Sequence, residues 1–67
     1  MRDEMIKVLK HHAEANVQLH QMNIEAYLNN PTGIGEHSDI MEAVQAELDK
    51  MAQHEDRLDI MKKYYNE

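Results

Sequence analysis

A single break divides this chain into two long stretches of helix-forming residues. The only proline and both glycines fall within residues 30–37. The residue before a proline is pushed out of the α-helical region, so the first helix ends before Pro31. On both sides of the break the chain is rich in Ala, Leu, Met, Glu, Gln and Lys, which favour helix. The sequence therefore predicts one all-α domain: a helix over 3–29, a loop over 30–37 and a helix over 38–65, folded back as an antiparallel hairpin.

A chain of 67 residues is too short to enclose a large hydrophobic core. It buries only about 60% of the surface that its unfolded form exposes, so chains of this size usually need a disulfide, a metal or an oligomeric partner. The chain has no Cys, which excludes disulfides and thiolate metal sites. A metal or a partner subunit remains.

The two predicted helices differ in the width of their apolar faces. On a helical wheel, the apolar face of residues 3–29 spans roughly 200°, whereas residues 38–65 carry one narrower stripe. One narrow stripe cannot cover the broad face of its partner. We therefore expect two hairpins to pack first helix against first helix, with each second helix flanking, as a homodimeric four-helix bundle. A trimer of hairpins satisfies the same argument.

This arrangement predicts two sets of packed residues. The expected core of each hairpin is Ile6, Val17, Ile24, Ile40, Val44, Leu48, Met51, Leu58 and Met61. The expected contact between subunits is Met5, Leu9, His12, Asn16, Leu19, His20, Asn23 and Tyr27. In the second helix, His54 falls in a gap of the apolar stripe, and Glu47 is expected to pair with Lys50 on the surface.

Polar side chains recur in the middle of the broad apolar face: His12, Asn16, His20 and Asn23. A buried polar layer commonly fixes the register and oligomeric state of a helical bundle, and this is the interpretation that we favour. The alternative is that these side chains hold a small polar ligand or ordered waters. Neutral imidazoles buried at a contact would also charge below about pH 6 and weaken the assembly.

The five His residues do not show metal-binding spacing. None has a Glu or Asp three residues before it, as a di-metal bundle requires, and neither helix contains a His-x-x-x-His pair. His12 and His20 lie about 12 Å apart along a helix axis, too far for one ion. We expect no metal and no cofactor, and a metal- or ligand-binding bundle is a distant alternative.

Catalysis by a side-chain nucleophile has no support either. Ser38 is better explained as the N-cap of the second helix than as a partner of His37. Thr32 lies among glycines without the lysine of a phosphate-binding loop. The sequence therefore predicts a protein that is not an enzyme.

The charge of the chain limits its partners. With 13 acidic and 7 basic residues, the net charge is −6, and the basic residues are scattered, which argues against nucleic acid. No apolar run is long enough to span a membrane or to serve as a signal peptide, so a cytoplasmic location is expected.

The segment from Pro31 to Ala43, continuing through residues 46–49, resembles small uncharacterised proteins of tailed phages that infect marine cyanobacteria. The resemblance extends from Leu9 to Tyr65. It implies a viral origin and a host-cell setting, and it brings no catalytic motif and no established activity.

Together these observations predict a non-enzymatic, homo-oligomeric helical interaction protein, a small structural or regulatory component. An unidentified protein partner is compatible with this prediction. The main alternative is an acidic modulator that inhibits a basic partner protein.

Overall fold

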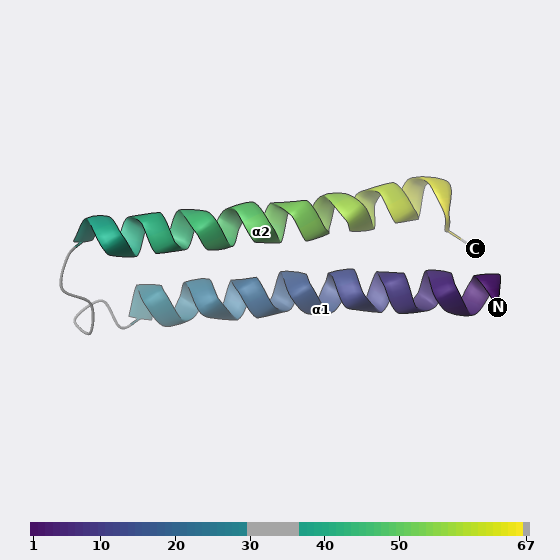
Figure 1. The fold of residues 1–67 in the computed structure, drawn as a ribbon, viewed down its shortest axis with the longest axis horizontal. Helices are drawn as coiled ribbons and strands as arrows, with labels where there is room; N and C mark the ends of the chain where they lie inside the picture. Colours follow the sequence, from purple (N-terminus) through teal and green to yellow (C-terminus); the bar gives the residue numbers. More distant parts are fainter. Residues whose placement is uncertain (30–36, 67) are drawn as a thin grey trace.

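Two antiparallel helices form the whole of the described structure, which is a computed structural model covering residues 1–29 and 37–66. Helix α1 spans Arg2–Asn29 and helix α2 spans His37–Tyr64. They lie side by side along most of their length, with the N- and C-termini at the same end (Figure 1). The predicted all-α hairpin is confirmed. The predicted loop falls almost entirely outside the described residues.

Charges at the helix ends agree with the helix dipole. Asp3 and Glu4 lie in the first turn of α1, and Asp39 lies in the first turn of α2. Lys62 and Lys63 lie in the last turn of α2. Acidic groups near an N-terminus and basic groups near a C-terminus each stabilise a helix by about 0.3–1 kcal/mol.

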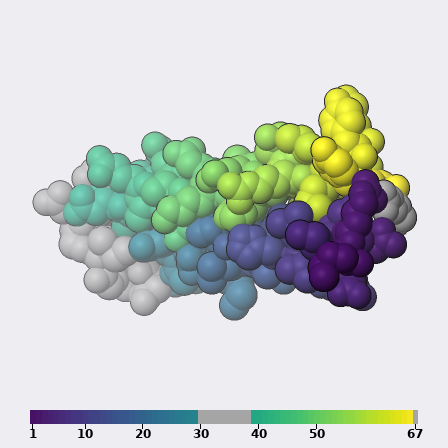
Figure 2. Space-filling view, turned by 45° about the vertical axis from the view of Figure 1, so that its right-hand side comes forward, coloured from purple at the N-terminus to yellow at the C-terminus, as the bar shows by residue number. Residues whose placement is uncertain are grey.

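The molecule is a thin rod of 49 × 15 × 13 Å. Its length follows from the helices, since 28 residues at 1.5 Å each span about 42 Å. Figure 2 shows the two helices side by side, with the start of α1 (purple) packed against the end of α2 (yellow) at one end. A rod only two helices thick has almost no interior.

The seam between the helices accordingly buries few side chains. Ala13, Ile40 and Leu58 are the apolar residues that become buried, with 2%, 8% and 9% of their surface exposed. No large side chain of the described residues is fully enclosed. Because Ala13 is small, the helix backbones can approach each other closely where it lies.

Candidate functional site

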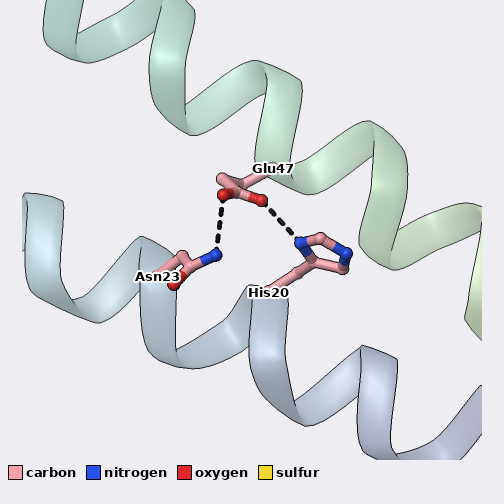
Figure 3. Close-up of polar contacts among 3 residues, drawn as sticks. All are labelled: His20, Asn23 and Glu47. Atoms are coloured by element: carbon pink, nitrogen blue, oxygen red, sulfur yellow. Dashed lines mark hydrogen bonds and ion pairs between the residues drawn. The ribbon is translucent and has the colours of Figure 1, made fainter.

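A polar network crosses the middle of the hairpin. Glu47 of α2 lies in the seam, and two side chains of α1 reach its two carboxylate oxygens (Figure 3). His20 Nδ1 lies 2.6 Å from Glu47 Oε2, and Asn23 Nδ2 donates to Glu47 Oε1 at 2.8 Å. His20 and Asn23 are three residues apart, so α1 presents both on one face, one turn from each other.

The network keeps Glu47 ionised. The hydrogen bond from His20 lowers the pKa of Glu47 below its ordinary value, outweighing the opposite effect of desolvation, and Asn23 adds to the lowering. Since an ionised carboxylate only accepts hydrogen bonds, His20 Nδ1 must carry a proton. The side chains of His20 and Glu47 are only 11% and 14% exposed, so little water competes for these bonds.

A row of imidazole rings continues from this network toward one face of the hairpin. The ring of His54 stacks on that of His20, with centroids 5.8 Å apart and planes 17° apart. His12 contacts His54 edge-on at 5.9 Å. Burial is the main factor that lowers the pKa of His54, followed by the charges of Arg57, His20 and His12. His54 is therefore neutral at neutral pH.

The geometry supports a packing role for these groups. Every buried side-chain nitrogen and oxygen of the described residues has a hydrogen-bond partner, so the network offers no free buried group to a ligand. Within residues 1–29 and 37–66, no three His, Asp or Glu side chains are grouped so that they could hold a metal ion. Of the nucleophiles considered from the sequence, Thr32 and the side chain of Ser38 lie outside the described part of the chain.

The residues predicted at the contact between subunits separate into two groups. Met5, Leu9, His12 and Leu19 are exposed, and three of them show more than half of their surface: 59% for Met5, 58% for Leu9 and 51% for Leu19.

The other predicted contact residues, Asn16, His20, Asn23 and Tyr27, are buried or half-buried within the hairpin. His20 and Asn23 contact α2 of the same chain. Asn16 turns back onto its own helix and donates to the carbonyl oxygen of His12 at 2.8 Å. A helical wheel gives the angle between residues of one helix, but the sector that α2 covers depends on how the two helices dock.

The predicted hairpin residues mostly lie in the seam. Ile40 and Leu58 are buried, and Ile6, Val17, Ile24, Val44, Met51 and Met61 are half-buried. Leu48 differs, since 48% of its surface is exposed and its neighbour Glu47 occupies the seam instead.

From the sequence, Glu47 is expected on the surface and His54 in a gap of the apolar stripe, and the contacts of both side chains with His20 are not predicted. A signal for them exists in the spacing of α2. Starting at Ile40, steps of four and three residues alternate and pass through both polar residues on the way to Tyr65: 40, 44, 47, 51, 54, 58, 61 and 65. Such alternation is typical of two helices packed in a coiled coil.

An open groove of about 860 Å³ lies at the end of the rod where the termini meet. Met1, Met5 and Leu9 of α1 line it together with Ile60 and Met61 of α2. The hairpin thus leaves an apolar surface uncovered along one side of the seam, where both helices contribute to it.

Comparisons with known protein families, with curated proteins and with solved structures found no match to this chain. Neither helix in the described part of the chain is long and apolar enough to cross a membrane. The polar network and the uncovered apolar surface are therefore the features from which a function can be inferred.

Proposed function

We propose that this protein is a non-enzymatic interaction protein that works as a homodimer, in which two hairpins form a four-helix bundle. Its role would be that of a small structural or regulatory component. The resemblance to phage proteins adds a viral setting to this proposal.

The observation that carries the proposal is the imbalance between buried and exposed apolar residues. Among the residues that the structure describes, three apolar residues are buried, whereas large apolar side chains along both helices keep 45–88% of their surface in water. The exposed set is Met1, Met5, Val8, Leu9, Leu19, Met22, Leu28, Met41, Leu48, Ile60, Tyr64 and Tyr65. Large contiguous apolar patches on a small protein mark surfaces that bind other molecules.

A second hairpin would supply what the first lacks. Small domains without disulfides or metals commonly gain stability by association, and a second layer of helices would turn one face of the rod into an interior. Two-fold symmetry is the commonest arrangement for such an association. It needs no partner other than the chain itself.

The polar network has a place in this proposal as a device for specificity. Apolar seams tolerate shifts in register, whereas a buried carboxylate that needs both His20 and Asn23 is satisfied in only one register. The network would align the two helices of each hairpin, and so align the surface that each hairpin presents to the other.

Sedimentation equilibrium of the full chain at micromolar concentration tests the proposal. The expected mass is twice 7.9 kDa, about 15.8 kDa, with helical circular dichroism at the same concentration. A mass three times that of the chain would support self-association of the hairpin, but the assembly would then be a trimer and not the proposed dimer. A folded monomer of 7.9 kDa would contradict the proposal.

A further inference from the structure

The uncovered surface of α1 has a regular spacing. Eight residues recur at alternating steps of four and three, and all of them are exposed in the hairpin. We call this set the outer stripe: Met1, Met5, Val8, His12, Ala15, Leu19, Met22 and Ala26. None of its members is Asp, Glu, Lys or Arg.

The outer stripe has the period of a coiled-coil seam. Alternating steps of four and three average 3.5 residues, the repeat that lets one helix follow another in a left-handed supercoil. Isolated exposed apolar residues need no explanation. A stripe with this period over seven consecutive steps is the pattern expected where a second helix packs.

The outer stripe adjoins the hairpin seam on α1, and at this border the ring of His12 contacts His54 of α2. From Met5 onward, each stripe residue except Val8 directly precedes a buried or half-buried residue of the seam, as Met5 precedes Ile6 and His12 precedes Ala13. One residue corresponds to about 100° around a helix. Two contact faces about a right angle apart are what a helix at the corner of a four-helix bundle needs.

We propose that the outer stripe is the dimer interface and that it packs antiparallel against the outer stripe of a second copy. This inference rests on the proposed homodimer and specifies its contact surface. With a two-fold axis between residues 13 and 14, each stripe residue meets a different one, as expected for an isologous contact. The opposed pairs are Met1 with Ala26, Met5 with Met22, Val8 with Leu19, and His12 with Ala15.

Size complementarity favours this occupant. At the two ends and at the centre, a large side chain, Met1 or His12, meets an alanine. Met22, which is 70% exposed, would lie over the apolar groove beside Met5 of the other copy. A long stripe that matches itself in this way needs no other partner.

The area that a stable dimer needs is a modest share of the surface of this chain. A typical stable interface takes about 800 Å² from each partner. That is about one seventh of the 5374 Å² surface of the chain. No acidic residue of this negatively charged chain belongs to the stripe, so like charges are not brought together there.

Matched leucine variants test the interface. Leu19 lies in the stripe and is 51% exposed, whereas Leu48 lies on α2 outside it and is 48% exposed. We expect Leu19→Glu to raise the dimer dissociation constant by about a hundredfold or more, and Leu48→Glu to leave it within about threefold of wild type. Sedimentation measures the mass, and circular dichroism measures the helix content of each variant.

If Leu19→Glu also loses helix, its failure to dimerise could reflect unfolding. Mixing it with a second charged variant then tests the interface directly. Val8→Lys alone should dissociate, and mixing it with Leu19→Glu should restore a helical dimer, because the new charges face each other in the antiparallel pairing. If Leu19→Glu forms a helical dimer when mixed with Leu19→Lys but not when mixed with Val8→Lys, the stripes pair in parallel. That result would overturn the antiparallel arrangement.

The two proposals fail in different ways. If wild type is a dimer and Leu19→Glu dimerises equally well, the outer stripe is not the interface, although the homodimer itself stands. A monomeric, folded wild-type chain would contradict the homodimer itself.

Discussion

Glu47 shows how one residue decides the alignment of two helices. Its carboxylate lies in a mostly apolar seam, where an ion without partners is costly. His20 and Asn23 each satisfy one of its oxygens. Because both donors come from one face of α1, a shift of either helix by a turn would leave the charge and both donors without partners.

We predict that Glu47→Leu lowers the melting temperature of the protein by several degrees, although leucine is more apolar than glutamate. The change leaves the buried donors of His20 and Asn23 without an acceptor. Asp49→Leu, at an exposed acidic position of the same helix, is the control and should melt close to wild type. Thermal unfolding followed by circular dichroism gives the answer, and an unchanged melting temperature in Glu47→Leu would show that the network adds no stability.

The stability of the protein should also decrease on acidification, through His54. Two imidazoles of α1, His12 and His20, face this ring, and Arg57 donates to its Nδ1 from the same helix at 3.5 Å. Burial and these neighbours lower the pKa of His54 from 6.5. The unfolded chain therefore binds more protons than the folded one as the pH falls below 6.5, and the free energy of unfolding decreases.

A second loss should follow at lower pH, because the lowered pKa of Glu47 contributes stability that is present above pH 4.5 and lost as the pH falls through its folded value. Urea unfolding at pH 8, 6, 5, 4 and 3 measures both losses of stability. His54→Gln should flatten the dependence between pH 8 and 5, whereas His11→Gln, at an exposed histidine, should not. Equal slopes in wild type and His54→Gln would contradict this assignment.

At the scale of the elements, α1 has two largely apolar faces: the seam that contacts α2, and the uncovered outer stripe that we propose as the dimer interface. The seam with α2 contains Ala13, and the outer stripe lies one residue back along the helix. This explains why a helical wheel of α1 gives one face of roughly 200°: it is the sum of two adjoining faces.

The burial of Ala13 in the seam, with 2% of its surface exposed, leads to a prediction about helix packing. Ala13→Leu should destabilise the hairpin by about 1–3 kcal/mol, because the larger side chain has no space between the backbones. Ala52→Leu, at an exposed position of α2, should change stability by no more than about 0.5 kcal/mol. Denaturant unfolding of the two variants compares them directly, and equal stabilities would mean that the helices can separate at Ala13 without cost.

At the scale of the whole molecule, the shape accounts for the small buried core of the hairpin. A body 15 Å by 13 Å in cross-section places every residue near the surface, so even the seam residues remain partly exposed. A second hairpin packed on the outer stripe, as we propose, would double the thickness in one direction and cover that stripe. The sedimentation experiment on wild type belongs to this scale, since it asks whether the folded unit is one rod or two.

The amino-acid sequence alone was sufficient to predict the two helices and their antiparallel hairpin, because the break before Pro31 and the helix-forming residues around it act locally. It also predicted a polar layer in α1 and most of the apolar residues of the seam.

Only the tertiary structure decided which sector of α1 faces α2, since periodicity gives angles within a helix and not the docking of one helix on another. That docking moved His20 and Asn23 into the hairpin, brought Glu47 and His54 to them, and left the outer stripe uncovered. Contacts between residues more than twenty positions apart depend on the relative placement of both helices, and this placement is set by packing along the whole seam.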